Sequence, residues 1–293
     1  MTSRQPVRAT GRLSSSEADD VLALAAAAGH LDGVYPLSED VVLRVCGDVP
    51  YQGVHLLSYA GDRLAGYAFL EDGSGELIVH PDFRRAGVGT ELLTAAGPGP
   101  LRFWAHGDDP GAAAFAAGNG FARARVLWQM RRSLVAPLPE IPLPAGVTLR
   151  HFRPGSDEQA WIGVNARAFA HHPEQGRWTV DDLLSREAEP WFDPAGFLLA
   201  VDIADTVLGF HWTKVHPASG DEPALGEIYV LGVDPSGHRR GLGAALSVAG
   251  LQYLAGRGLT VAGLYVDESN SAAVKLYRGL GFEIFKTDVN YSR

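Results

Sequence analysis

Two glycine-rich segments of the sequence combine the residue types that bind a phosphate group. Residues 84–89 read RRAGVG and residues 238–243 read HRRGLG, each between an apolar run and a helical pattern. Because glycine has no Cβ, the backbone N–H groups of such a turn approach a ligand closely, and the start of the following helix favours an anion. Neither segment has the Gly-Lys-Ser/Thr of a P-loop or the third glycine of the dinucleotide fingerprint. The pattern predicts a pyrophosphate site; for one copy alone, the alternative is glycine that permits close helix packing.

Two side chains in the second half have the chemistry to transfer protons. Glu227 lies in an otherwise apolar run, where strand alternation places Glu227, Tyr229 and Leu231 on one face unless a bulge intervenes. Tyr277 lies two helical turns after Asn270, on the same face of a predicted helix. A carboxylate suits removal of a proton from an amine, and a phenol suits its delivery to a thiolate. The alternatives are a solvated strand carboxylate and a core tyrosine.

The glycine segments belong to a longer internal repeat. LIVHPDFRRAGVGTEL, at residues 77–92, aligns with LGVDPSGHRRGLGAAL, at residues 231–246. Further landmarks recur in the same order, a Gly-aromatic pair before each copy and a Gly-Phe pair after it, at residues 66–67, 209–210, 120–121 and 281–282. The chain is therefore predicted to consist of two homologous halves.

The elements that must position these residues follow one plan in both halves. Four prolines in residues 137–144, with Gly146 after them, predict an extended linker. We expect an N-terminal domain at residues 1–136, a linker at 137–146 and a C-terminal domain at 147–293. Each is predicted as a layered α/β (α+β) unit, with a mixed, mostly antiparallel sheet flanked by helices. Ser14 with Glu17 predicts the start of a helix, and Gly29 its end.

Composition limits the classes of partner. The 293 residues carry 25 Lys and Arg against 34 Asp and Glu, a net charge of −9, which argues against sequence-independent binding of nucleic acid. The single cysteine, Cys46, rules out an internal disulfide framework and fits a reducing cytoplasm. No targeting or membrane segment and no spacing typical of a metal site is found, and a cytoplasmic monomer without metal is expected.

The glycine turn and a later run, NSAAVKLYRGLGF at residues 270–282, resemble the GNAT family of acyl-CoA-dependent N-acetyltransferases. The tandem arrangement further resembles the mycothiol-forming branch of that family, which acetylates the cysteinyl amine of cysteinyl-glucosaminyl-inositol. The stretches that carry this likeness are HPEQGRWT (172–179), WFDP (191–194), GFHWTKVHP (209–217), GEIYVLGVDP (226–235) and WAHG (104–107).

The resemblance implies direct transfer from acetyl-CoA, with Glu227 as general base and Tyr277 as general acid. In the first half, Gly73 and Ala116 occupy the corresponding positions, so that half is expected to bind acetyl-CoA without turnover. Coenzyme contacts are expected in the second half at Leu231, Gly232, Val233, His238, Arg239, Arg240, Gly241, Leu242, Gly243, Ala244, Asn270, Ser271, Ala272, Ala273, Val274 and Lys275. In the first half they are expected at Leu77, Ile78, Val79, Arg85, Ala86, Gly87, Val88, Gly89 and Thr90.

The resemblance also implies a polar site for the thiol-sugar acceptor. Its expected residues are Glu39, Glu174, Lys214, Glu227 and Tyr265. Taken without the family, a loop acid is often solvated, a strand lysine usually extends to solvent and a strand tyrosine packs. Two other functions are a tandem acetyltransferase for another small amine, such as an aminoglycoside, and a non-catalytic acyl-CoA sensor. The Glu227 and Tyr277 pair argues against the sensor.

Overall fold

The computed structural model describes residues 5–47, 51–171, 175–218, 222–237 and 241–293. The chain forms two compact units. Unit 1 consists of Met1–Trp128, Asp267–Ser269 and Lys286–Arg293, and unit 2 of Gln129–Val266 and Asn270–Phe285. The last strand of the chain therefore ends in unit 1, although most of the second half belongs to unit 2. The domain bounds expected from the sequence stay a prediction.

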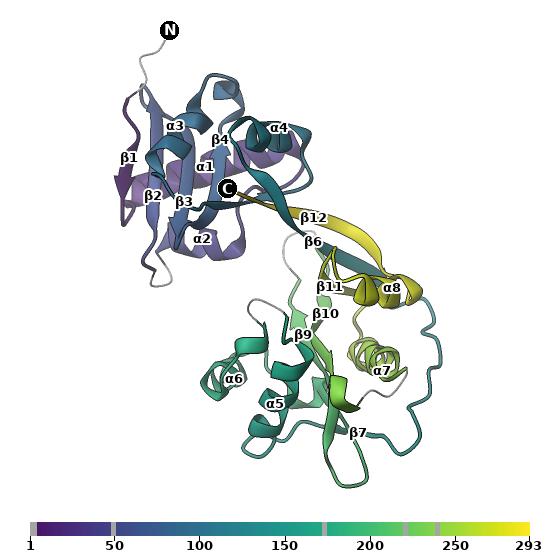
Figure 1. The fold of residues 1–293 in the computed structure, drawn as a ribbon. Helices are drawn as coiled ribbons and strands as arrows, with labels where there is room; N and C mark the ends of the chain where they lie inside the picture. Colours follow the sequence, from purple (N-terminus) through teal and green to yellow (C-terminus); the bar gives the residue numbers. More distant parts are fainter. Residues whose placement is uncertain (1–4, 48–50, 172–174, 219–221, 238–240) are drawn as a thin grey trace. The chain divides into compact units, whose positions relative to one another are not determined.

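Unit 1 is a sheet with helices on both faces (Figure 1). Its strands run in the order β1-β2-β3-β4-β5, and the end of β12 pairs with β5. One face carries α1 and α2 and the other carries α3 and α4, because alternate strand residues such as Leu57 and Leu56 pack on opposite sides. Its elements are β1 (Arg8–Thr10), α1 (Ser15–Asp32), α2 (Glu39–Cys46), β2 (Val54–Ala60), β3 (Arg63–Glu71), β4 (Ser74–Val79), η1 (Pro81–Phe83), α3 (Val88–Ala95), β5 (Arg102–His106) and α4 (Pro110–Gly118).

Unit 2 repeats this arrangement. Its strands follow the order β11-β10-β9-β8-β7, with the end of β6 beside β11. The helices α5 and α6 cover the face that carries Phe210 and Trp212, and α7 covers the opposite face. Its elements are β7 (Thr148–His151), α5 (Glu158–Ala168), η2 (Gln175–Arg177), α6 (Val180–Glu187), η3 (Pro194–Gly196), β8 (Phe197–Val201), β9 (Val207–His216), β10 (Leu225–Val233), η4 (Pro235–Gly237), α7 (Leu242–Gly256) and α8 (Ser271–Gly279). The strands β6 (Ala122–Ser133), β11 (Val261–Asp267) and β12 (Glu283–Ser292) have residues in both units.

Helix α1 shows how local sequence sets an element's ends. Ser14 and Glu17 form a reciprocal capping box at its start, as the sequence predicts. The predicted end at Gly29 is wrong, because the helix continues to Asp32 and stops where Gly33 adopts a left-handed φ of 73°. Gly29 instead makes room for a neighbouring segment: a Cβ there would lie 3.3 Å from Tyr35 Cα.

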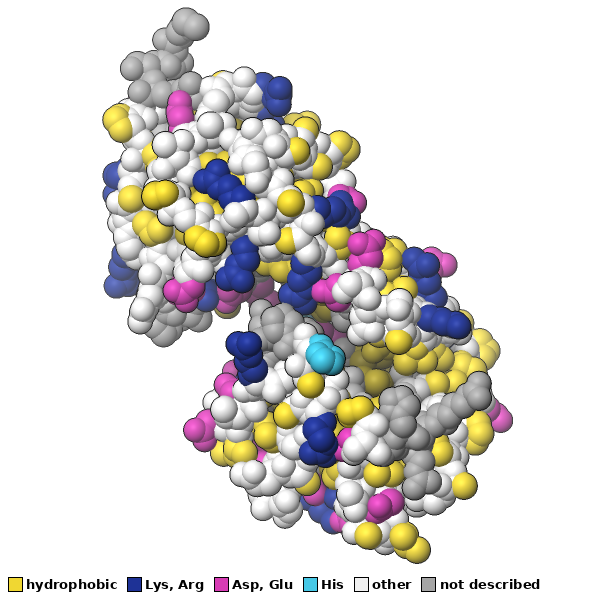
Figure 2. Space-filling view, in the orientation of Figure 1, with side chains coloured by type: hydrophobic (Ala, Val, Ile, Leu, Met, Phe, Trp, Pro, Cys, Tyr) yellow, Lys and Arg dark blue, Asp and Glu magenta, His cyan; other side chains and the backbone are white. Residues whose placement is uncertain are grey.

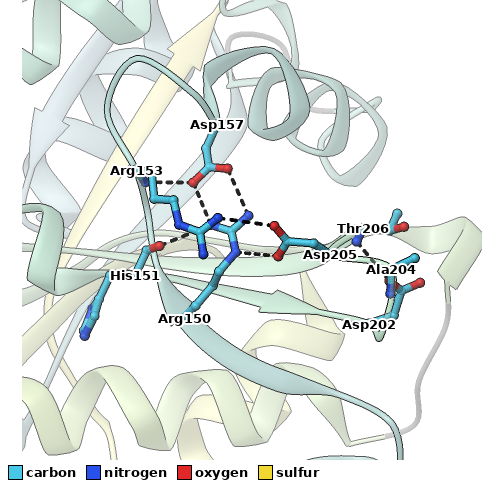
Figure 3. Close-up of polar contacts among 8 residues, drawn as sticks. All are labelled: Arg150, His151, Arg153, Asp157, Asp202, Ala204, Asp205 and Thr206. Atoms are coloured by element: carbon cyan, nitrogen blue, oxygen red, sulfur yellow. Dashed lines mark hydrogen bonds and ion pairs between the residues drawn. The ribbon is translucent and has the colours of Figure 1, made fainter.

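A network of ion pairs fixes the β7 edge of unit 2 (Figure 3). Arg150 donates two hydrogen bonds to Asp157, at 2.6 and 2.9 Å, and a third to Asp205 at 2.6 Å. The backbone N–H of Arg153 also donates to Asp157. These bonds raise the pKa of Arg150 above its ordinary value, the hydrogen bonds to Asp157 contributing most. The network joins the start of α5 to the turn between β8 and β9.

The surface of the chain mixes charges of both signs. On the face shown in Figure 2, the coloured Lys and Arg side chains alternate with Asp and Glu over both units. In the part of the chain that the structure describes, no helix combines the length and the apolar character needed to cross a membrane. The charges on this face are thus mixed, and the net charge of the whole sequence is −9.

Candidate active site

Both glycine turns contain a glycine in the left-handed region. Gly87 precedes α3 with a φ of 89°, and Gly241 precedes α7 with a φ of 88°. Among the described residues, no side chain caps either helix start, so the first-turn N–H groups are left to a ligand or solvent. The second glycines differ: a Cβ on Gly89 would lie 2.8 Å from the Phe115 ring, whereas one on Gly243 would make only ordinary contacts. Gly89 therefore also serves helix packing.

Two neighbouring parallel strands diverge in front of each glycine turn. In unit 1 the β4–β5 ladder ends at the pair Glu76 and Trp104. In unit 2 the β10–β11 ladder ends at the pair Glu227 and Gly263. Beyond these pairs the facing backbone groups of the strands are not used in the ladder, and in unit 1 this leaves a slot towards the glycine turn. The predicted coenzyme residues 77–79 and 231–233 line these diverging ends.

Unit 1 contains a cavity of about 700 Å³ at this slot. It lies between the diverging strands, the glycine turn and the start of α4, and its volume is in the range of small-molecule sites. The walls include every coenzyme residue predicted for the first half except Ala86. Arg84 also lines the cavity, but its guanidinium is held by Asp32 at 2.6 and 2.8 Å. The cavity supports the predicted coenzyme site of unit 1 without testing it.

Strand β10 of unit 2 contains a bulge at Tyr229. Glu227 pairs with Lys214 and Ile228 with Thr213, but the next pair is Val230 with Trp212. The extra residue shifts the alternation by one. This bulge is the exception that the expected alternation allowed for, so Leu231 leaves the face of Glu227 and Tyr229 and packs against the α7 side.

Glu227 lies on the α5 and α6 face with only a small part of its surface exposed. Its Oε2 is hydrogen-bonded to Nε2 of His216 at 2.6 Å, and among the described residues no hydrogen bond to its second oxygen is recorded. Lys214, directly across the ladder, directs its ammonium to the Trp191 ring at 4.6 Å and makes no recorded ion pair with Glu227 in the described chain. One carboxylate oxygen and one ammonium thus remain available to a polar ligand.

Tyr277 is buried on α8, beside the glycine turn. Its ring packs edge-on against Phe282 at 5.7 Å, and burial raises the pKa of its phenol to about 12. The preceding residue on the helix, Leu276, is the side chain that a Cβ on Gly243 would contact at 3.9 Å. Asn270 caps the same helix by accepting a hydrogen bond from the Ala273 N–H. Helix α8 therefore approaches the start of α7 at Leu276, the residue before Tyr277.

Unit 1 has no corresponding acid and phenol. Its β3–β4 ladder runs without a bulge, so register places Ser74, and not Gly73, at the position of Glu227. Counting back from Pro81 and Pro235 of the repeat had aligned Gly73 with Glu227. That alignment is one residue off because β10 has an extra residue that β4 lacks. Ala116 occupies the Tyr277 position in the sequence repeat and lies buried in the core of unit 1.

A buried charge cluster occupies the same region of unit 1. His106 is hydrogen-bonded to Glu76 and Asp288, both at 3.1 Å. The second oxygen of Glu76 accepts from the Ser38 N–H at 2.9 Å, which fixes the start of α2. Burial opposes the charge on His106, but the hydrogen bonds to Asp288 and Glu76 outweigh it and raise its pKa to about 9. Both Glu76 oxygens are therefore occupied.

Two of the remaining predicted site residues, Glu39 and Tyr265, belong to different units. Glu39 begins α2 in unit 1, and Tyr265 lies on β11 in unit 2, where its side chain is half exposed. By alternation Tyr265 shares the face of Gly263, the ladder partner of Glu227. Glu174, His238, Arg239 and Arg240 lie outside the described residues. Among those described, no cluster of three or more His, Cys, Asp or Glu side chains suited to a metal ion is found.

Sequence reasoning missed the role of His216, which it interpreted as a structural or surface histidine. The spacing of Lys214 and His216 could have indicated it, because residues two apart on a strand share a face and both lie on β9. What the sequence lacked was the β9–β10 register, which alone brings His216 diagonally next to Glu227.

The fold and the family model define an acetyl-CoA-dependent N-acetyltransferase: the model of the acetyltransferase (GNAT) family matches residues 165–282. A GCN5-related N-acetyltransferase from Sphaerobacter thermophilus matches with a TM-score of 0.74 and 27% identity, covering 98% of this chain and 95% of its own. A tandem GNAT protein from the clavulanic acid biosynthesis pathway has the same fold, with a TM-score of 0.69 at 20% identity over 99% of this chain and 98% of its own.

The sequence is also similar to the mycothiol acetyltransferase of Salinispora arenicola, with 56% identity over 308 aligned residues that cover 100% of both chains. The chain therefore belongs to the mycothiol acetyltransferases of the GNAT family. The predicted fold class, family and enzyme class are confirmed.

Proposed function

We propose that unit 2 transfers the acetyl group of acetyl-CoA to the cysteinyl amine of cysteinyl-glucosaminyl-inositol, which completes mycothiol. The observation that carries the proposal is Glu227, a buried carboxylate at the last paired residue of two diverging strands. The name of the relative from Salinispora arenicola supports the choice of acceptor. A cysteinyl α-amine has a pKa of about 8, so a carboxylate suffices to remove its proton near neutral pH.

The proposed reaction needs two proton transfers. Glu227 takes a proton from the amine, directly or through one water, as the amine nitrogen attacks the thioester carbonyl carbon. The C–S bond then breaks, the amide forms and the coenzyme sulfur leaves as a thiolate. Tyr277 donates its phenolic proton to that sulfur; its pKa of about 12 keeps it protonated at neutral pH. Backbone N–H groups released by the strand divergence near Val233 would hold the carbonyl oxygen.

The glycine turns would hold the coenzyme diphosphate in both units. Support comes from the left-handed Gly87 and Gly241 and from the uncapped helix starts after them. The acceptor would contact Lys214, Glu227 and Tyr265, with Glu174 and Glu39 as further proposed contacts. Unit 1 would bind a second acetyl-CoA without turnover, because Ser74 and Ala116 can neither remove nor deliver a proton at those positions.

Mass spectrometry of the acceptor tests the proposed function. Incubation with acetyl-CoA should add one acetyl group at the cysteinyl amine of cysteinyl-glucosaminyl-inositol. An aminoglycoside offered under the same conditions should stay unmodified. Acetylation of the aminoglycoside alone, or acetyl-CoA binding with no transfer to either amine, would contradict the proposal.

A further inference from the structure

The carboxylate of Glu227 is held from one side by a histidine on the neighbouring strand. His216 ends β9, and its Nε2 lies 2.6 Å from Glu227 Oε2. The side chain of His216 is 39% exposed and that of Glu227 11% exposed, so the pair reaches from solvent into the slot between the strands. The two residues come from segments joined by a loop, and the β9–β10 register fixes their spacing.

The groups that face this pair come from four elements. Lys214 lies on β9, Tyr229 on β10 and Tyr265 on β11, while Arg186 of α6 donates to the Tyr229 hydroxyl at 3.1 Å. Burial raises the pKa of the Tyr229 phenol. The hydrogen bond and charge of Arg186 lower that pKa, whereas the carboxylates of Glu227 and Glu189 raise it. Lys214 is directed to the Trp191 and Tyr229 rings. Of these groups, His216 is the one recorded as hydrogen-bonded to Glu227.

When one oxygen of a carboxylate accepts a hydrogen bond from a fixed donor, the orientation of the whole carboxylate is fixed, and with it the direction of the second oxygen. Without that bond, the side chain of a glutamate rotates among several rotamers, and only some of them present an oxygen to a bound amine. A donor on Oε2 therefore orients the other oxygen of Glu227 for proton removal. This argument requires only that His216 donate an N–H, and a glutamine amide at the same position can do that as well.

We propose that His216 is a positioning residue for the reaction: its Nε2–H holds one oxygen of Glu227 and directs the other to the acceptor amine. The inference rests on the proposed role of Glu227 as general base. It does not require His216 to change its protonation state during the reaction.

Three variants of the full chain test the proposal by steady-state kinetics with acetyl-CoA and cysteinyl-glucosaminyl-inositol. His216→Leu removes the donor and should lower kcat about 10- to 100-fold, the loss typical of a misplaced catalytic group. The KM for acetyl-CoA should stay within about two-fold, because the glycine turn is untouched. His216→Gln keeps a donor and should restore kcat to within about three-fold of the parent chain. His151→Leu, at an exposed histidine on β7, is the matched control and should change neither constant.

The outcomes separate this proposal from the proposed function. Full activity of His216→Leu would overturn it, and so would a His216→Gln variant as slow as His216→Leu, because the imidazole itself would then be needed. In the background of Glu227→Gln, His216→Leu should cause no further loss; a further loss of the same size would show that His216 acts independently of Glu227. Full activity of Glu227→Gln alone would instead contradict the proposed function.

Discussion

Strands β4 of unit 1 and β10 of unit 2 occupy the same place before a glycine turn, yet they carry different chemistry. Strand β4 pairs regularly with β3, whereas β10 has one extra residue at Tyr229. The bulge lets Glu227 and Tyr229 share the face covered by α5 and α6 while Leu231 joins the core under α7. One inserted residue therefore separates the face that carries Glu227, the proposed general base, from a packing face within a single strand.

The buried acids of these two strands, Glu76 on β4 and Glu227 on β10, differ in how many of their oxygens have protein partners. Both carboxylate oxygens of Glu76 in unit 1 are hydrogen-bonded within the protein, one to His106 and the other to the Ser38 N–H. Glu227 has one recorded partner among the described residues, His216. Burial is therefore common to the two carboxylates, and what distinguishes Glu227 is an oxygen without a partner among the described residues. In unit 1 the cavity is present, and the buried acid of β4 has a structural role.

The largest expected effect comes from the two acids themselves. Glu227→Gln removes the base and should lower kcat about 10²- to 10⁴-fold, the usual contribution of general acid–base catalysis. Glu76→Gln, the same change at the buried acid of β4, should leave kcat within about two-fold even if it lowers the melting temperature. Steady-state kinetics of both variants decides this. Equal losses in kcat would break the distinction between the units.

The second effect concerns the phenol. Tyr277→Phe keeps the packing against Phe282 but removes the proton donor, so kcat should fall about 10- to 100-fold with little change in the KM for acetyl-CoA. Since burial raises the pKa of Tyr277 to about 12, its ionisation should not limit the wild-type rate at neutral or mildly alkaline pH. Tyr59→Phe in unit 1 serves as the control. An unchanged rate in Tyr277→Phe would remove the phenol from the mechanism.

The ion pairs of the two units should differ in stability. Arg150 and Asp157 are 15% and 8% exposed, whereas Arg84 and Asp32 are about one-third exposed. Arg150→Ala leaves two carboxylates without their main partner and should lower the free energy of unfolding by about 2 kcal/mol. Arg84→Ala should cost less than about 1 kcal/mol, as exposed ion pairs do. Urea unfolding measures both, and the reverse order would contradict the comparison.

The glycine turns offer a smaller, more specific test. Alanine at a left-handed φ costs about 1 kcal/mol, so Gly241→Ala should raise the KM for acetyl-CoA about five-fold by disturbing the turn. Gly87→Ala should leave the kinetics unchanged and weaken one of two binding sites in equilibrium dialysis with acetyl-CoA. If Gly87→Ala altered the KM instead, unit 1 would take part in turnover.

The smallest expected effect is a pH dependence of the stability of unit 1. The folded chain raises the pKa of His106 to about 9 from an ordinary value of 6.5. Its contribution to stability is therefore complete below pH 6.5 and is lost as the pH rises towards about 9. His106→Gln should lower the melting temperature at pH 6 and approach the wild type at pH values above about 9. Thermal unfolding across this range, with His151→Gln as control, checks the trend; a difference that grows with pH would contradict it.

Sequence reasoning succeeded where one residue dictates its own geometry. The glycine turns were predicted at helix starts from the short Gly-x-Gly pattern, and the capping box of Ser14 and Glu17 was predictable because both partners lie within one helical turn. The repeat likewise predicted two related halves. These signals are local, so no tertiary contact was needed to recognise them.

It failed where the outcome depends on pairing between distant segments. Helix α1 continues past Gly29 to Asp32, and Gly29 serves a close approach to Tyr35 that the helical pattern does not reveal. The Tyr229 bulge and the His216 contact follow from the β9–β10 register, and His106 meets Asp288 across 182 residues of sequence. None of these has a signature in a single stretch of residues.

The most direct test of the account uses the double variant Glu227→Gln/Tyr277→Phe, in which unit 1 is intact. Transfer of radiolabelled acetyl to cysteinyl-glucosaminyl-inositol is measured beside equilibrium binding of acetyl-CoA. The account predicts that acetyl-CoA still binds with the stoichiometry of the parent chain while transfer falls to the uncatalysed background. Transfer at the parent rate would show that the chemistry does not depend on these two side chains of unit 2.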